Sequence, residues 1–140
     1  MKRKVKFAAL FLAVALLALA LAGCAQDPPK HPLVAKWTLR SEDGKRQITY
    51  SFEAVGDAEF YLWTWDDEEG RLVQREYFWG EYTADDENGT VSLELENDDD
   101  EHRSAHFAYA IEADGQTLRL TDGDEVLVLE RAAENSARVR

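Results

Sequence analysis

Three side chains in one short stretch of the chain are of the types that hydrolases use. His102, Ser104 and His106 alternate along the sequence, so in a β-strand all three would share one face. A serine hydrolase also needs a base within hydrogen-bond reach of its serine and an acid that orients that base. Ser104 does not lie in the sharp Gly-x-Ser-x-Gly turn that presents such a nucleophile. We therefore interpret this stretch as a solvated strand face and predict that the protein is not an enzyme.

Carboxylates gather in several short segments, which raises the question of a metal site. Ca²⁺ takes six to eight oxygen ligands in proteins. The run Asp98–Glu101 lacks the alternating spacing that directs successive side chains to one ion, and Asp122–Glu125 is too short. The only cysteine is Cys24, and the two histidines of the domain lack the spacing of zinc ligands. The sequence therefore predicts no metal and no cofactor, and acidic turns that keep the domain soluble.

The single thiol lies at the end of an amino-terminal pattern that is typical of exported proteins. Lys2–Lys6 carries four basic residues, and the apolar run Phe7–Leu21 follows it, as in a secretory signal peptide. The segment Leu21-Ala22-Gly23-Cys24 resembles the bacterial lipobox, in which the chain is cut before the cysteine and the thiol receives a lipid. The resemblance implies a helical signal peptide over residues 1–23 and a membrane attachment through lipid on Cys24. The alternative is an uncleaved anchor helix, at the short end of what spans a bilayer of about 30 Å.

The residue after the cysteine bears on which membrane would hold the protein. In Gram-negative bacteria an Asp at that place tends to retain lipoproteins in the inner membrane, and here the residue is Ala25. The resemblance then implies the periplasmic side of the outer membrane in a Gram-negative cell. In a Gram-positive cell it implies the outer face of the plasma membrane, so both alternatives lie in the cell envelope.

The charge of the chain restricts its partners. The 140 residues carry a net charge of −12, and residues 1–23 contain four basic and no acidic residues, so the rest carries −16. Nucleic acid and anionic lipid surfaces repel such a chain. We therefore exclude nucleic-acid binding and expect the domain to hang from its lipid rather than lie flat on the membrane.

Alternation of apolar and polar residues predicts β-strands along most of the chain after residue 32. Leu33–Arg40 and Ile48–Glu53 alternate regularly, and Asn88-Gly89 is a strong hairpin signal. Gly80 is expected to mark a bulge or tight bend. No segment after the leader keeps a helical period, and short connections favour antiparallel neighbours. We predict an all-β fold, an up-and-down antiparallel β-barrel of eight to nine strands, because closure removes exposed strand edges.

These patterns divide the chain into four segments. Residues 1–23 form the leader, 24–32 a Pro-rich tether, 33–131 the barrel and 132–140 a flexible tail. The three prolines of the tether favour an extended spacer of about 3.1 Å per residue. His31 lies in this tether, and we expect its side chain to be solvated.

The aromatic-rich stretch from residue 60 to residue 65 is the best lead to a binding surface. Three large aromatic side chains alternate there: Tyr61, Trp63 and Trp65. If Phe60 and Leu62 face inward, these three face outward and form a patch for a protein or a glycan. The opposite register would place them in a ligand cavity. A third alternative is a central strand that other segments cover on both sides.

With these strands placed, the chain resembles the small lipocalin-like lipoproteins of bacteria. Leu33–Leu39 resembles their first strand and Ile48–Phe52 their second. Gly80-Glu81-Tyr82 resembles a Gly-x-Tyr element, and Gln116–Leu120 with Leu127–Arg131 resembles their closing hairpin. The resemblance implies a non-enzymatic, membrane-anchored domain that binds a small apolar or amphipathic ligand. The alternative is an envelope protein-interaction or inhibitor module that binds through the aromatic strand.

The resemblance also implies one structural pair. In lipocalins a first-strand Trp packs under an Arg of the last strand at the closed end of the barrel, and Trp37 and Arg131 match those positions. Such a cation–π contact is worth about 0.5–2 kcal/mol. Ala35 stands where the family has Gly, and the span from residue 33 to 131 is short for a lipocalin. A barrel of this size is filled by its own side chains or holds one small ligand.

Overall fold

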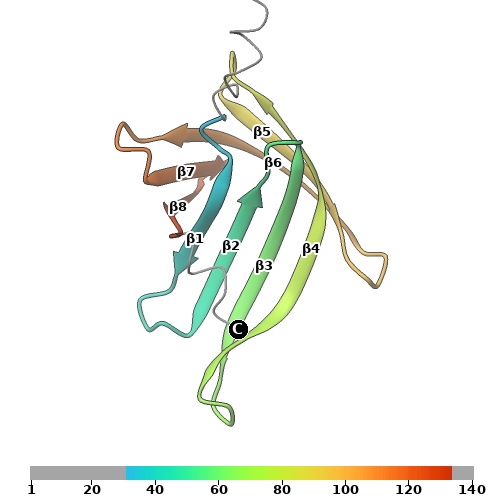
Figure 1. The fold of residues 1–140 in the computed structure, drawn as a ribbon, viewed down its shortest axis with the longest axis vertical. Coiled ribbons are helices and arrows are strands. Elements are labelled where there is room, and N and C mark those ends of the chain that lie inside the picture. Colours follow the sequence, from blue (N-terminus) through green and yellow to red (C-terminus); the bar gives the residue numbers. More distant parts are fainter. Residues whose placement is uncertain (1–30, 134–140) are drawn as a thin grey trace, which may run out of the picture. The chain divides into compact units, whose positions relative to one another are not determined.

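Eight β-strands make up residues 31–133, the part of the chain that this computed structural model describes (Figure 1). They are β1 (Ala35–Arg40), β2 (Arg46–Phe52), β3 (Asp57–Asp66), β4 (Arg71–Asp85), β5 (Thr90–Glu96), β6 (His102–Ile111), β7 (Thr117–Asp122) and β8 (Glu125–Arg131). Each strand pairs antiparallel with the next, and β8 pairs with β1, so the sheet closes on itself. The predicted all-β, up-and-down antiparallel barrel is therefore confirmed. The expected signal peptide, Cys24 and the tail from residue 134 onward lie outside the described residues.

Gly80 explains why the barrel has eight strands, the lower end of the predicted range. The pattern around Gly80 suggests two strands, but β4 runs through it without a break. Gly80 lies opposite Leu95 of β5, and a Cβ atom there would be 2.0 Å from the main-chain oxygen of Glu94. Glycine thus permits an approach of two backbones that a side chain would prevent. The bulge lies elsewhere, between Leu62 and Trp63 in the β3–β4 ladder.

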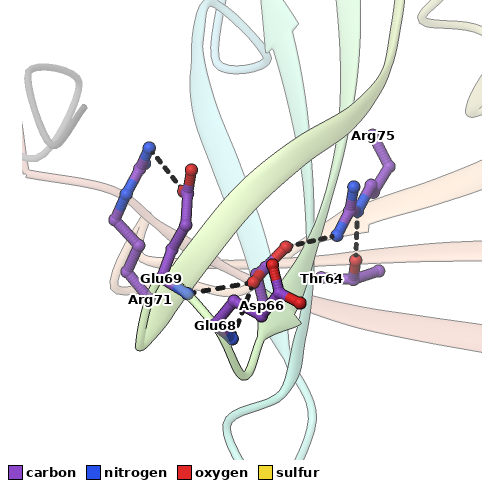
Figure 2. A network of polar contacts seen from close by, with 6 residues as sticks. All are labelled: Thr64, Asp66, Glu68, Glu69, Arg71 and Arg75. Carbon is purple, nitrogen blue, oxygen red and sulfur yellow. Dashed lines mark hydrogen bonds and ion pairs between the residues drawn. The ribbon is translucent and has the colours of Figure 1, made fainter.

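The β3–β4 hairpin extends beyond the strands beside it at the bottom of Figure 1. Figure 2 shows the polar network that fixes its turn. One carboxylate oxygen of Asp66 accepts the backbone N–H groups of Glu68 and Glu69 at 2.9 and 3.0 Å. The other lies 3.1 Å from the guanidinium of Arg75, which also donates to Thr64 at 3.0 Å. These bonds lower the pKa of Asp66, the backbone bond from Glu69 most of all.

One end of the barrel is filled by its own side chains. We call this end, where β1 begins and the β2–β3, β4–β5 and β6–β7 turns lie, the packed end. Its large side chains are less than 2% exposed: Leu33, Trp37, Phe52, Val91, Leu93, Leu118, Leu120 and Leu129. At about 25 cal/mol per Å² of apolar surface removed from water, these residues dominate the stability of the fold.

His31 closes the packed end, and the expectation that its side chain is solvated is wrong. Its Nδ1 accepts the backbone N–H of Leu33 at 3.1 Å, so Nε2 carries the proton and donates to Asp86 at 2.7 Å. The same Asp86 oxygen accepts the hydroxyl of Tyr109 at 2.8 Å. The turn that these bonds hold places Leu33 in the core, where its carbonyl oxygen accepts the indole N–H of Trp37 at 2.9 Å.

Trp37 and Arg131 lie directly opposite each other in the β1–β8 ladder. Trp37 is completely buried, whereas Arg131 is exposed. Among residues 31–133, the contacts found between a guanidinium and an aromatic ring belong to a different arginine, Arg103. The register thus places the two residues side by side, and the buried indole donates its N–H to the backbone at residue 33.

Candidate functional site

The opposite end of the barrel, which we call the mouth, contains a positive charge among aromatic rings. Arg103 of β6 points inward, with its guanidinium carbon 4.3 Å from the ring centroid of Phe78 and 5.2 Å from that of Phe60. Its terminal nitrogen lies 3.6 Å from a carboxylate oxygen of Glu76. Both side chains are about two-fifths exposed, so water reaches this pair. The arrangement presents a cation on an aromatic floor, and within residues 31–133 its one ion-pair contact is long.

Half-buried apolar side chains surround this cation on the inner wall. Those packed against the core from the mouth side are Leu39, Ile48, Tyr50, Leu62 and Leu127. The ring of Tyr50 contacts Phe60 and Phe107 at centroid distances of 5.0 and 6.1 Å. Burial raises the pKa of Tyr50, while the charge of Arg103 lowers it. The mouth therefore combines apolar walls, a phenol that stays protonated at neutral pH, and one guanidinium.

A hollow lies beside the mouth, between the β3–β4 and β5–β6 hairpins, which diverge in Figure 1. It has a volume of about 330 Å³ and is lined by Arg75–Phe78 of β4 and by polar and acidic residues of the β5–β6 loop: Asn97, Asp98, Asp99 and Glu101. A second hollow, of about 300 Å³, lies over Gly80 and His102. Both are open and mainly polar, so neither is an enclosed apolar cavity of the kind that buries a ligand completely.

A row of aromatic side chains covers the outer surface of β3 and β4. Phe60 is buried and Leu62 packs against the core, so the outward orientation of Tyr61, Trp63 and Trp65 is the one observed. The rings of Tyr61 and Trp63 are nearly parallel, with centroids 6.1 Å apart. β4 adds Tyr77, 4.8 Å from Tyr61, and Trp79, 5.5 Å from Tyr77. We call these five residues the outer aromatic row.

Glu59 organises the centre of this row. The hydroxyl of Tyr61 donates to one of its carboxylate oxygens, and the hydroxyl of Tyr77 donates to the same oxygen at 3.1 Å. Burial, followed by these contacts with Glu59, raises the pKa of both tyrosines. Beside the row, Ser51 and Thr49 of β2 lie opposite Glu59 and Tyr61 and are only 3% and 8% exposed although they face outward. The row is therefore a fixed surface layer, and Trp65 at its end is 41% exposed.

The candidate hydrolase residues do share the outer face of β6, but they do not contact one another. Ser104 donates to Glu94 at 2.5 Å, across the β5–β6 ladder. His106 instead contacts the hydroxyl of Ser92 at 2.7 Å. His102 lies opposite Glu96. Each residue is thus paired with β5, and Ser104 has an acid beside it rather than a base.

Within residues 31–133, no cluster of three or more His, Cys, Asp or Glu side chains is arranged to hold a metal ion. Nor does this part of the chain contain a helix of the length and hydropathy needed to cross a bilayer. The acidic runs at Asp98–Glu101 and Asp122–Glu125 lie in the β5–β6 loop and at the β7–β8 turn.

Sequence reasoning missed two features of these surfaces. The sequence does not single out Arg103. The inward-facing residues of β6 are Arg103, Ala105 and Phe107, and a charged residue at the start of such a series is typical of a loop. Tyr77 and Trp79 alternate around buried Phe78 and could have been recognised as a continuation of the outer aromatic row. The interruption by Arg75 and Glu76 obscured that alternation, because the β3–β4 register shifts there.

Comparisons with protein-family models, with curated proteins and with solved structures find no match to this chain.

Proposed function

We propose that the protein is a non-enzymatic, lipid-anchored binding domain of the bacterial cell envelope, which takes a small amphipathic ligand at the mouth of its barrel. The closed eight-stranded barrel is an architecture compatible with a lipocalin-like ligand-binding domain. Arg103 on its aromatic floor is the observation that supports the proposal most. A ligand with an anionic headgroup and an apolar chain matches a guanidinium set among Leu39, Ile48 and Leu62.

The packed end limits how much of a ligand the barrel accepts. Trp37, Phe52 and the leucines around them are buried and fill the interior at that end. An apolar chain that enters the mouth would therefore stop at the level of Tyr50 and Phe107. The proposed ligand is therefore small, and part of it remains outside. Glu76 competes with the headgroup for Arg103, because its carboxylate occupies one side of the guanidinium.

Calorimetric titration with dodecanoate, dodecanol and dodecyltrimethylammonium tests the ligand class. We expect dodecanoate to bind best and Arg103→Met to weaken it about tenfold, since a hydrogen bond to a charged group contributes roughly 1.5–3 kcal/mol. Glu76→Gln is the matched variant and should tighten binding, because it removes the competing charge. Equal affinity for the three amphiphiles in the wild type and both variants would show that Arg103 does not recognise the ligand's headgroup.

The anchor is tested separately. Resemblance to the lipobox supports lipid on Cys24, which we propose holds the domain in the outer membrane or on the outer face of the plasma membrane. Two or more acyl chains are needed for stable attachment, since each buried methylene contributes only about 0.8 kcal/mol. Mass spectrometry of the amino-terminal peptide should find acylated Cys24, and Cys24→Ser should leave the protein in the soluble fraction. An intact, unmodified amino terminus would contradict the anchor.

The outer aromatic row supports a second candidate, an envelope protein-interaction or inhibitor module. Trp and Tyr are the residues that most often supply binding energy at interfaces, and the row presents Trp65 at an exposed end. A protein captured from envelope extracts by the wild type should be lost with Trp63→Ser and Trp65→Ser combined. Val126→Ser is the control, because Val126 is 49% exposed on β8, away from the row. Capture that survives the double change would exclude the row as the binding surface.

A further inference from the structure

Strand β6 has a long unpaired edge toward the mouth. β5 pairs with β6 from His102 to Ala108, whereas β7 pairs with it only from Ala108 to Ile111. β7 ends at Asp122, where the chain turns back into β8, so no strand within residues 31–133 continues the ladder along His102–Phe107. On its inner side this half of β6 contributes Arg103 and Phe107 to the barrel. The barrel wall is therefore incomplete along one strand edge.

The hydrogen-bonding groups of this edge can be assigned from bonds at the packed end. Tyr109 donates its backbone N–H to Gly89 on the β5 side, and Glu112 donates its N–H to Thr117 on the β7 side. Backbone groups in an antiparallel strand alternate between the two sides residue by residue. The groups that point away from β5, where residues 31–133 supply no strand, belong to His102, Ser104 and His106. Their spacing is that of the donor and acceptor pairs that a neighbouring strand would use.

Acidic residues border both ends of the free edge. The loop Asn97–Glu101 leads directly into it and contains four consecutive carboxylates. Asp122, which would lie across from Phe107 if the β6–β7 register continued, begins the acidic turn that ends at Glu125. With Glu94 beside Ser104 on the outer surface, the surroundings are strongly negative. An incoming strand that carries positive charge would gain electrostatically at both ends.

We propose that this edge of β6 binds an extended, Lys- or Arg-rich peptide segment of a partner protein by β-strand addition. Main-chain hydrogen bonds to the free groups supply affinity, and the alternating side chains supply selectivity. On the outer face the peptide's cations would approach Glu94 and the acidic loop. On the inner face it would meet Ala105 and Phe107, and the Arg103 charge excludes a second cation there. Alternating basic and apolar residues are the pattern that fits.

A second copy of this chain is a poor occupant of the same edge. Two copies paired through β6 would bring together two domains of the same strong negative charge, since the sequence has 28 acidic and 16 basic residues. Like charges at an interface oppose association and suppress wrong partners. The charge thus selects a basic partner over self-pairing. The inference does not depend on what the mouth or the outer aromatic row binds.

Hydrogen exchange followed by NMR tests the proposal on the whole chain. The probe is a peptide of about eight alternating Lys and Val residues, long enough at ~3.3 Å per residue to cover the edge. We expect saturable binding that weakens with salt, together with slower exchange at the amides of His102, Ser104 and His106. A Glu-Val peptide of equal length should not bind. Absence of saturable binding by the Lys-Val peptide overturns the proposal.

Two substitutions at one position separate strand addition from simple charge attraction. Ser104→Pro removes a backbone N–H that faces the free side, so it should leave the β5 ladder intact and weaken the peptide at least tenfold. Ser104→Ala is the matched control, because it also loses the side-chain bond to Glu94 but keeps the N–H. Binding by Ser104→Ala should stay within about twofold of the wild type. Equal binding by both variants overturns the strand-addition proposal.

Three other results would overturn it as well. Protection that appears at β3 and β4 instead would assign the peptide to the outer aromatic row. Protection of the β6 amides without peptide, lost when the chain is ended at Ala133, would assign the edge to the protein's own residues 134–140. A dimer in sedimentation experiments that Ser104→Pro dissociates would assign the edge to self-pairing.

Discussion

The two ends of this barrel differ in how their side chains are buried and paired, although the same strands build both. At the packed end, aromatic and leucine side chains exclude water, and His31 and Trp37 satisfy their polar atoms with neighbouring groups. At the mouth, apolar side chains are half-buried, Arg103 lies 3.6 Å from the carboxylate of Glu76, and no strand of residues 31–133 pairs with the free edge of β6. The difference indicates that the packed end supplies most of the stability, whereas the mouth supplies the capacity to bind. Changes at the packed end should therefore alter unfolding, and changes at the mouth should alter binding.

A matched pair of leucine truncations should show this separation most strongly. Leu118 is fully buried at the packed end, whereas Leu127 is half-buried at the mouth. Leu118→Ala should lower the free energy of unfolding by about 2–5 kcal/mol, the range for a buried leucine that leaves a cavity. Leu127→Ala should cost about 1 kcal/mol, because water already reaches the site. Urea denaturation measures both, and equal losses would contradict the comparison.

Gly80 tests whether the close approach of β4 and β5 is required between the two ends. Gly80→Ala places a methyl group 2.0 Å from the main-chain oxygen of Glu94, so one strand must move. We expect a loss of about 1–3 kcal/mol, the usual cost of overpacking. Gly44→Ala is a useful comparison, because Gly44 has nothing within 4 Å of the added atom and differs by its φ of +72°. A larger loss at Gly44 would mean that backbone freedom matters more than the strand contact.

The pH dependence of the packed end should follow Asp86 and Tyr109. The hydrogen bonds from His31 and then Tyr109 lower the pKa of Asp86, so its contribution is present above the unfolded pKa near 4 and disappears as pH falls through the folded value. Burial and the Asp86 contact raise the pKa of Tyr109 to about 12. Its contribution is present below its ordinary value of 10.0 and disappears as pH rises toward 12.

Thermal unfolding across pH measures these two windows. Asp86→Asn should reduce the loss of melting temperature at both extremes, because it removes the carboxylate that both partners bind. Asp114→Asn, at another exposed turn, should leave the profile unchanged, because asparagine keeps the oxygen that accepts the Gln116 N–H. Identical profiles for the wild type and Asp86→Asn would show that Asp86 does not cause the pH dependence of the melting temperature.

The smallest effect on stability is expected from Arg103→Met at the mouth. The guanidinium contributes about 0.5–1 kcal/mol by cation–π contact at a solvated site, and methionine retains part of the packing. Unfolding should therefore change by less than about 1 kcal/mol, while binding of an anionic amphiphile changes tenfold. A large loss of stability would show that the mouth is part of the structural core.

Fold class could be predicted from the sequence because it depends on repetition. Alternation such as Ile48, Tyr50, Phe52 recurs with short turns between strands, and few architectures accommodate that pattern. The number of strands depends on Gly80. A glycine there is typical of a break between two strands, but it is also required by the close contact between β4 and β5, and only the structure shows that the contact explains it.

The candidate sites were predictable only where they follow strand alternation. Tyr61 and Trp63 face outward because Phe60 and Leu62 face inward, and this follows from the period of two. Arg103, by contrast, becomes notable only because β3, β4 and β6 bring two rings beneath it. The His31–Asp86 contact joins residues 55 positions apart, and no local pattern contains that information.

The attachment of His31 also has a mechanical consequence. Because the described chain enters at the packed end, a force transmitted through the preceding residues meets the His31–Asp86 contact and then β1. β1 shares six register pairs with β2 but only two with β8, so a pull along its axis would load the β2 side as a set of parallel bonds in shear. The two β1–β8 pairs would then break before the six β1–β2 pairs. The pairing of β1 would therefore determine the force at which the domain unfolds.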